Sequence, residues 1–192
     1  MERTPGQILE AVAAVLDDLN IPYLVGGSFA SIAYGTHRTT QDVDFVVDIR
    51  LNQADSLVEA LKERFYISDD AVREGIRRRG MFNAIHYETS FKVDFYVLKE
   101  GAYDRVQFER RGAATLDETS ERMIMMASPE DTVVKKLEWY KLGECISERQ
   151  WNDVIGVMKV QGERLDEKYM REWADKLGIA DLLEKALTEA GL

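Results

Sequence analysis

The stretch that most constrains the fold of this chain covers residues 25–48. It contains a Gly-Gly-Ser turn at residues 26–28, a short apolar segment, a polar loop, and a segment at 42–49 in which apolar residues alternate with others. Because successive side chains of a strand point to opposite faces, alternation of this kind predicts a half-buried β-strand. We therefore expect strand, glycine turn, short helix, loop and second strand, with one face of the second strand in the core.

Two carboxylates lie on the other face of that second strand. Asp42 and Asp44 are two residues apart, so they point the same way, about 6–7 Å apart. A third acid, Asp94, interrupts an otherwise apolar strand expected at 91–98. A charge there is costly unless it is paired, coordinated or beside a cleft. Three carboxylates on neighbouring strands repel one another unless cations lie among them, and Mg²⁺ prefers oxygen ligands. The acids therefore predict a metal site.

The glycine turn predicts a phosphate site. Gly27 and Ser28 stand where a strand passes into a helix, and the first N–H groups of a helix are unpaired and favour anions. A phosphate-binding turn together with paired carboxylates indicates phosphoryl or nucleotidyl transfer with Mg²⁺. The chain has neither a Gly-x-x-x-x-Gly-Lys-Ser/Thr pattern nor a kinase glycine-rich loop, so a phosphatase or kinase is the weaker interpretation.

The pattern changes from mixed to helical near Ser128. Residues 1–127 alternate between helical and strand periodicity, with an irregular strand expected within 103–127, whereas Ser128-Pro129 begins a series of helices that continues to the end. We expect an α/β (α+β) fold: a lobe at 1–127 with a mixed sheet and a helical lobe at 128–192. Core positions are expected to include Cys145, the Met cluster at 123–126, Trp139, Tyr140 and a Leu165, Tyr169, Trp173, Leu177 stripe. For Trp139 and Tyr140 the alternative is stacking on a nucleobase.

Charge and hydropathy exclude several classes of protein. The formal net charge is −10, which argues against a protein that grips duplex DNA along its backbone. The dense basic cluster at 73–79 is interpreted as a solvated helix end, with a phosphate or RNA contact as the alternative. No apolar run is long enough for a membrane span, the first residues lack a signal-peptide pattern, and one cysteine allows no internal disulfide. A cytoplasmic location is expected.

Further polar residues compete for a role at the site. Lys136 lies at the edge of an apolar helical stripe and is preferred over Lys135 for phosphate, while Arg38 either binds phosphate or pairs with an acid. Asp153 lies on the polar side of its helix and is interpreted as a solvated acid. His37 and His86 lack the partners that a zinc site or a catalytic triad requires.

The motifs resemble a known family. Gly26-Gly27-Ser28, Tyr34-Gly35 and Arg38-Thr39-Thr40-Gln41-Asp42-Val43-Asp44, with Asp94 later, resemble the nucleotidyltransferase superfamily of the DNA polymerase β fold. Within it, the chain is similar to small prokaryotic nucleotidyltransferases related to abortive-infection (AbiEii-type) toxins of type IV toxin–antitoxin systems. Lys136-Leu137-Glu138-Trp139-Tyr140 and Glu148-Arg149-Gln150-Trp151 extend this resemblance into the helical half.

The resemblance implies a role for each motif residue. Gly27 and Ser28 would hold the β- and γ-phosphates of a nucleoside triphosphate such as ATP, with Arg38 and Lys136 as further phosphate ligands. Asp42 and Asp44 would bind two Mg²⁺ ions, which Mn²⁺ can replace, and Asp94 would complete the site and take the proton of the acceptor hydroxyl.

The resemblance also implies a reaction and partners. A nucleoside monophosphate would pass to a hydroxyl of a protein, a tRNA end or a small molecule such as an antibiotic, and an antitoxin protein would be a partner. The alternative is a catalytically inactive nucleotide- or partner-binding module on the same fold.

Overall fold

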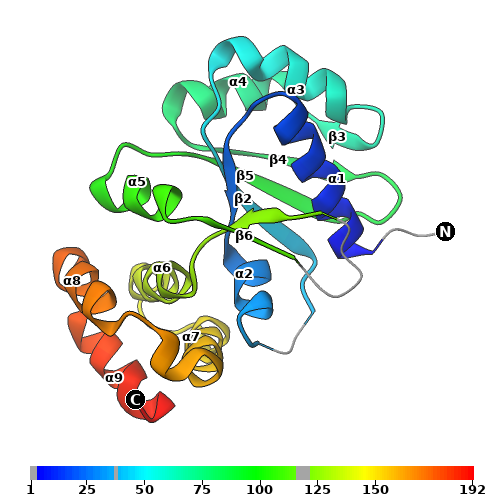
Figure 1. Ribbon diagram of the computed structural model, residues 1–192. Coiled ribbons are helices and arrows are strands. Elements are labelled where there is room, and N and C mark those ends of the chain that lie inside the picture. Colours follow the sequence, from blue (N-terminus) through cyan, green and yellow to red (C-terminus); the bar gives the residue numbers. More distant parts are fainter. Residues whose placement is uncertain (1–3, 37–38, 116–121) are drawn as a thin grey trace. The chain divides into compact units, whose positions relative to one another are not determined.

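The computed structural model describes residues 4–36, 39–115 and 122–192 (Figure 1). The chain forms two compact units. The first unit comprises Met1–Gly26 and Thr39–Met126, and the second comprises Gly27–Arg38 and Ala127–Leu192. The sequence analysis placed residues 27–38 with the α/β lobe, whereas the structure groups them with the C-terminal helices.

The first unit is built on a mixed sheet. The strands that the described residues form are β1 (Tyr23–Val25), β2 (Asp42–Val47), β3 (Phe65–Ile67), β4 (Met81–His86), β5 (Lys92–Val97), β6 (Gly112–Ala114) and β7 (Ile124–Met126). Their order is β3-β4-β5-β2-β1-β7-β6. β2 is parallel to β5 and β1 is parallel to β7, whereas the other neighbours are antiparallel. The acid-bearing strands β2 and β5 are therefore neighbours at the centre of the sheet.

One face of this sheet forms the core of the first unit. Val43, Phe45 and Val47 of β2 are fully buried, as the alternation predicts. Phe95 of β5 stacks against Phe45 and Phe82, with ring centroids 5.7 and 4.9 Å apart. Burial of each such side chain contributes about 1.5–3 kcal/mol, so this face fixes the register of β2 and β5. The acids therefore lie on the opposite face of β2 and β5.

The helices of the first unit are α1 (Pro5–Asp18), α3 (Ala54–Leu61), α4 (Asp69–Arg78) and α5 (Ala102–Glu109), with a short 3₁₀ turn at Leu51–Gln53. α1 begins with a capping box, in which Thr4 and Gln7 exchange hydrogen bonds. α3 contacts both α1 and α4, and these three helices lie together in Figure 1.

The structure corrects four expectations in the first unit. Residues 102–109 form α5 instead of a strand, because Tyr103, Gln107 and Phe108 are buried at helical spacing. The three-residue strands β3 and β6 were not predicted. The spacing of Leu57, Leu61 and Phe65 in the sequence favours one helix face, but Phe65 lies in β3. In the Met cluster Met126 is buried, but Met123 is 56% exposed, because it precedes β7.

The second unit is helical. Its helices are α2 (Gly27–Ala33), α6 (Pro129–Leu142), α7 (Glu148–Gln161), α8 (Glu167–Leu177) and α9 (Ala180–Ala190), with a 3₁₀ turn at Gly162–Arg164. Hydroxyl or carboxylate side chains cap three of them at Ser128, Ser147 and Asp166. α2 contacts both α6 and α7. The short helix after the glycine turn is therefore packed on the two longest helices of this unit.

Three core expectations in the second unit are wrong. Cys145 is exposed, because it lies in the loop between α6 and α7 with a positive φ of 60°. Trp139 is 46% exposed, whereas Tyr140 packs against Trp151. On α8 the buried residues are Met170 and Ala174 instead of the expected stripe of Tyr169, Trp173 and Leu177.

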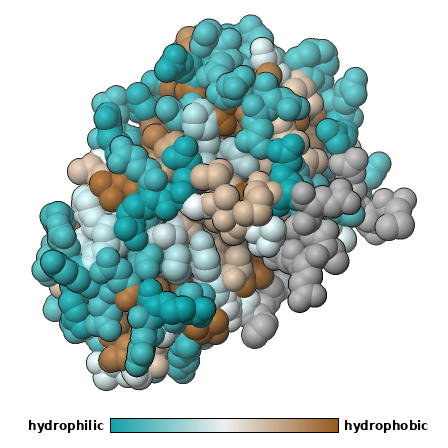
Figure 2. All heavy atoms as spheres, in the orientation of Figure 1, coloured by the Kyte–Doolittle hydropathy of each residue, from teal (hydrophilic) through white to brown (hydrophobic). Residues whose placement is uncertain are grey.

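The surface is mainly hydrophilic on the face drawn in Figure 2, with smaller apolar patches between the charged side chains. The basic cluster at 73–79 is largely neutralised: Arg73 pairs with Asp69 and Asp55, Arg78 pairs with Glu74, and Arg79 pairs with Glu100. These contacts favour the solvated helix end over a phosphate or RNA contact. Within the described residues, every helix is too short or too polar to cross a bilayer.

Candidate active site

The three acids lie on one face of the first unit's sheet. β2 and β5 run in parallel with Asp42 opposite Lys92 and Asp44 opposite Asp94. Residues opposite one another in register point to the same side, so Asp42, Asp44 and Asp94 share a face with Lys92. Thr40 donates a hydrogen bond of 2.6 Å to Asp42 Oδ1. The strand β1 ends beside these acids, because the Gly26 N–H donates to the Asp44 carbonyl oxygen over 2.9 Å.

Asp94 is the most buried acid of the three. Its side chain is 5% exposed, and its Oδ2 accepts from Lys92 Nζ at 2.8 Å. Its Oδ1 is buried and has no hydrogen-bond partner among the residues that the structure describes. Buried carboxylate oxygens in proteins are nearly always hydrogen-bonded or coordinated, so this oxygen is available to a ligand.

The charges of the acids perturb two neighbouring groups. The hydrogen bond with Asp94 raises the pKa of Lys92, burial lowers it, and the charges of Asp94, Asp42 and Asp44 raise it further. Burial raises the pKa of Tyr96 to about 12, and the charges of Asp44, Asp94 and Asp42 add to this effect. The three carboxylates therefore act together as one negative cluster on this sheet face.

The cluster offers the type of donor that a hard divalent cation prefers. Mg²⁺ and Mn²⁺ favour carboxylate oxygens, and the orphaned Asp94 Oδ1 lacks the ligand that such a cation would supply. The three carboxylates do not converge on one metal position, however. Among residues 4–36, 39–115 and 122–192, no group of three or more His, Cys, Asp and Glu side chains is arranged so that it could hold a metal ion.

The predicted phosphate turn lies at the start of the second unit. Gly27 has a φ of 56°, a left-handed conformation that favours glycine, and this turns the chain from β1 into α2. Ser28 is 7% exposed, and its Oγ accepts from Arg149 Nη2 at 2.9 Å. Arg149 of α7 therefore places a guanidinium beside the Gly27-Ser28 turn, where it would complement the charge of a phosphate.

The Tyr34-Gly35 motif fastens the end of α2. The Tyr34 hydroxyl donates to the Ala127 carbonyl oxygen at 2.7 Å, and Gln161 Nε2 donates to the Tyr34 carbonyl oxygen at 3.0 Å. Gly35 has a φ of +136°, and a Cβ atom there would lie 2.5 Å from Val160. Burial, followed by the charges of Glu130 and Asp131, raises the pKa of Tyr34. This motif is therefore structural: it holds the helix that follows the glycine turn.

Lys136 forms a buried ion pair. Its Nζ lies 2.8 Å from Asp153 Oδ2, and the two side chains are 12% and 2% exposed. Asp153 was expected to be a solvated acid; that expectation is wrong, because α7 contacts α2, α6 and α9 and is covered on more than one side. Lys135 instead pairs with Glu138, and its side chain is 31% exposed. Asp153 is one helical turn from Arg149, so the two lie on one face of α7.

The remaining sequence candidates are placed as follows. Arg38 and His37 lie outside the described residues. His86 is buried in β4, and its Nδ1 lies 3.0 Å from Thr89 Oγ1. Sequence reasoning missed Lys92 and Thr40 as parts of the cluster. Each stands two residues before an acid, and this spacing could have predicted that they share a face with the acids.

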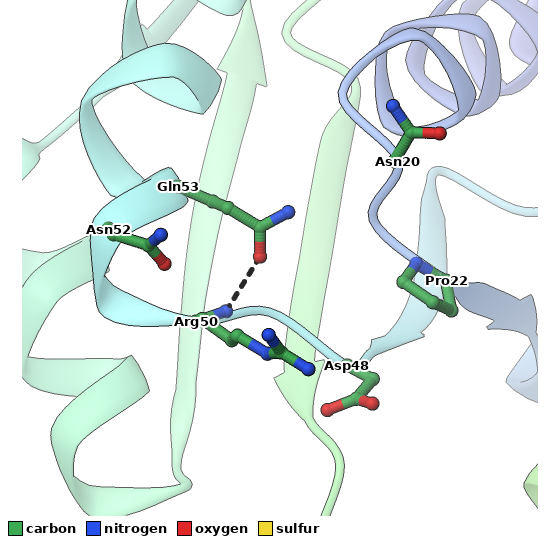
Figure 3. A pocket seen from close by; sticks show the side chains of 6 residues that line it. All are labelled: Asn20, Pro22, Asp48, Arg50, Asn52 and Gln53. Atoms are coloured by element: carbon green, nitrogen blue, oxygen red, sulfur yellow. Dashed lines mark hydrogen bonds between the residues drawn. The ribbon is translucent and has the colours of Figure 1, made fainter.

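A separate polar pocket of about 280 Å³ lies elsewhere in the first unit (Figure 3). Its lining residues are Asn20, Pro22, Asp48, Arg50, Asn52 and Gln53, and Gln53 Oε1 accepts from the Arg50 N–H at 3.0 Å. Asp48 follows the carboxyl end of β2, whereas Asp42 begins that strand, so the two are about 20 Å apart. The pocket is therefore not part of the carboxylate cluster.

Solved structures of similar fold are nucleotidyltransferases. The antibiotic-resistance factor ANT(2'')-Ia matches with a TM-score of 0.60 at 14% identity, covering 96% of this chain and 99% of its own. The lincosamide antibiotic adenylyltransferase LnuA, solved with lincomycin bound, matches with a TM-score of 0.51 at 11% identity, covering 83% and 99%. A nucleotidyltransferase-like protein from Paracoccidioides brasiliensis matches with a TM-score of 0.56 at 16% identity, covering 95% and 91%. These likenesses show the polymerase β-like nucleotidyltransferase fold.

Comparison at the level of families gives a more specific result. No match was found among curated proteins. The model of the family described as nucleotidyl transferase AbiEii toxin, type IV toxin–antitoxin system, matches residues 7–141. This match covers β1, the glycine turn, the acids of β2 and β5, and most of α6. The chain therefore belongs to the AbiEii nucleotidyl transferase family, and it is a nucleotidyltransferase by that membership.

Proposed function

We propose that this protein is a divalent-metal-dependent nucleotidyltransferase that moves a nucleoside monophosphate from a nucleoside triphosphate, ATP among them, to a hydroxyl group. One observation carries the proposal. Asp44 and Asp94 stand in register on neighbouring parallel strands, and within the described part of the chain Asp94 keeps a buried oxygen without a hydrogen-bond partner. Acids held in this way are ready to take a cation instead of a protein donor.

The carboxylates of the first unit would bind the metal ions and accept the proton of the acceptor. Bound Mg²⁺ ions, or Mn²⁺ in their place, would supply charge to the attacking and leaving oxygens of an in-line displacement. Asp42 and Asp44 would hold these ions, and Asp94 would share them and accept the proton of the acceptor hydroxyl. A bond forms between the acceptor oxygen and the α-phosphorus, the bond from that phosphorus to the bridging oxygen breaks, and pyrophosphate leaves with the electron pair.

The basic and hydroxyl groups of the second unit have the phosphate role. Gly27 and Ser28 would bind the β- and γ-phosphates, and Arg149, which already contacts Ser28, would add charge to the same turn. Lys136 would bind phosphate from α6 while Asp153 orients its ammonium. Arg38 keeps its predicted phosphate role.

The similar structures support a small molecule as one class of acceptor. An adenylylated aminoglycoside, adenylyl-2''-tobramycin, is bound to ANT(2'')-Ia, and lincomycin is bound to LnuA. We keep a small molecule, a protein side chain and a tRNA end as acceptors of this chain. Membership of a toxin family supports an antitoxin protein as partner and action in the cytoplasm.

The test is incubation with Mg²⁺, labelled nucleoside triphosphates and cell extract. Label that becomes attached to an acceptor with the native protein, and not with the Asp44→Asn variant, supports the proposal. Nucleotide binding without transfer to any component of the extract would support the inactive binding module instead.

A further inference from the structure

Lys92 is a cation in direct contact with the carboxylate cluster. Its ammonium reaches Asp94 Oδ2 at 2.8 Å, while Asp94 Oδ1 stays buried without a partner among the described residues. We propose that Lys92 is a displaceable counter-ion: its ammonium balances Asp94 in the metal-free protein and leaves Asp94 when a divalent cation binds to the acids. This inference rests on the proposed function, since it assumes that the acids hold a metal ion.

The strand register places Lys92 among the acids. It precedes Asp94 by two residues on the same face of β5, and its partner across the strands is Asp42. The ammonium and a divalent cation would therefore compete for the same oxygens. Two cations a few ångströms apart repel strongly, so the ammonium and the metal cannot both occupy the contact with Asp94 without cost.

Burial decides which group moves. The Asp94 side chain is 5% exposed and is fixed by the central strand β5, whereas the Lys92 side chain is 43% exposed. A lysine has a flexible four-carbon stem and an ammonium that is readily hydrated, so Lys92 can withdraw into water. Asp94 gains from the exchange, because its orphaned oxygen obtains a ligand.

The displacement has two consequences. Lys92 weakens metal binding, because the ion pair must break first, and it stabilises the metal-free protein by reducing repulsion among the acids. Lys92 is thus a positioning residue that acts on metal binding through Asp94. A permanent structural partner of Asp94 would keep its contact when the metal binds, and it would not weaken metal binding.

The first test is calorimetric titration of the full chain with Mn²⁺. We expect the Lys92→Gln variant to bind Mn²⁺ about tenfold more tightly than the native protein. This change in affinity is at the low end for loss of a charge-assisted contact, because Lys92 is partly exposed. Lys92→Arg keeps the charge and should remain within about threefold of the native affinity. Lys99→Gln removes an exposed lysine just beyond β5 and is the matched control for loss of one positive charge. Equal or weaker binding by Lys92→Gln would overturn the proposal.

The second test uses the native protein, so it does not depend on the folding of a variant. An amine-acetylating reagent is applied with and without Mn²⁺, and modification of Lys92 and Lys99 is measured by mass spectrometry. Release from Asp94 should make Lys92 more reactive in Mn²⁺ while Lys99 stays unchanged. Unchanged or reduced reactivity of Lys92 would contradict displacement.

The Asp44→Asn variant separates this proposal from the proposed function. If the native protein and Asp44→Asn give the same Mn²⁺ titration, the acids do not hold the metal, and both proposals fail. If the native protein binds Mn²⁺ through Asp44 and Lys92→Gln binds it no more tightly, the counter-ion proposal fails and the metal-dependent reaction stands.

Discussion

Replacing Lys136 with methionine should destabilise the second unit strongly. The substitution keeps the length of the side chain but removes the ammonium that lies 2.8 Å from Asp153, whose side chain is 2% exposed. Removing one partner of a buried pair costs about 3–5 kcal/mol, because the other charge stays in a poorly solvated place. Asp153 has further contacts, so we expect the low end, about 3 kcal/mol.

Urea unfolding followed by tryptophan fluorescence measures this effect selectively. All three tryptophans, Trp139, Trp151 and Trp173, lie in the second unit, so the signal reports the unfolding of that unit. Lys135→Met is the matched control on the same helix. It breaks a partly exposed pair with Glu138 and should cost no more than about 0.5 kcal/mol.

A double variant completes the test. Lys136→Met combined with Asp153→Leu removes both charges, and replacing a buried ion pair with apolar groups is often close to neutral, so most of the loss should be recovered. If Lys136→Met is as stable as Lys135→Met, or if the two changes at 136 and 153 are additive, the buried pair is not the reason for the effect and the reasoning is refuted.

Three further predictions concern single features. Gly35→Ala should cost about 1–3 kcal/mol in the same assay, because φ is +136° and the new Cβ would meet Val160; native stability would contradict this. Tyr96 should titrate with a pKa near 12 in an NMR titration of labelled tyrosine, and a lower pKa is expected in Asp44→Asn. Because the folded pKa of Tyr96 is raised above its ordinary value of 10.0, stability should fall as the pH rises from 10.0 to about 12; no fall there would argue against the raised pKa. Chelation of divalent cations should abolish nucleotide transfer, and Mn²⁺ should restore it; transfer in excess chelator would exclude the metal-dependent reaction.

Local patterns account for the part of the fold that the sequence predicts. The alternation in β2 is a property of six consecutive residues, and the capping box of α1 needs only Thr4 and Gln7. Both features depend on neighbours in the chain, so tertiary packing did not change them. α5 was missed because its buried residues, Tyr103, Gln107 and Phe108, make too short a helical pattern to outweigh the β-propensity of Val106 and Phe108.

The candidate site was predictable only as far as its acids. The spacing of Asp42 and Asp44 shows that they share a face, but the register of β2 and β5 is needed to place Asp44 opposite Asp94 and Asp42 opposite Lys92. The helical wheel placed Asp153 in water because it considers one helix alone. Packing of α7 against three other helices buries that acid and makes it the partner of Lys136.

The central claim is that the acids of β2 and β5 support transfer of a nucleotide, and the position of the transferred label tests it most directly. The protein is incubated with an acceptor-containing extract and Mg²⁺, using triphosphate labelled in parallel on the α- or the γ-phosphate. Asp44→Asn removes a site acid, and Asp48→Asn, at the exposed far end of the same strand, is its matched control. The account predicts transfer of the α-label alone, lost in Asp44→Asn and kept in Asp48→Asn. Transfer of the γ-label, or undiminished α-label transfer by Asp44→Asn, would contradict it.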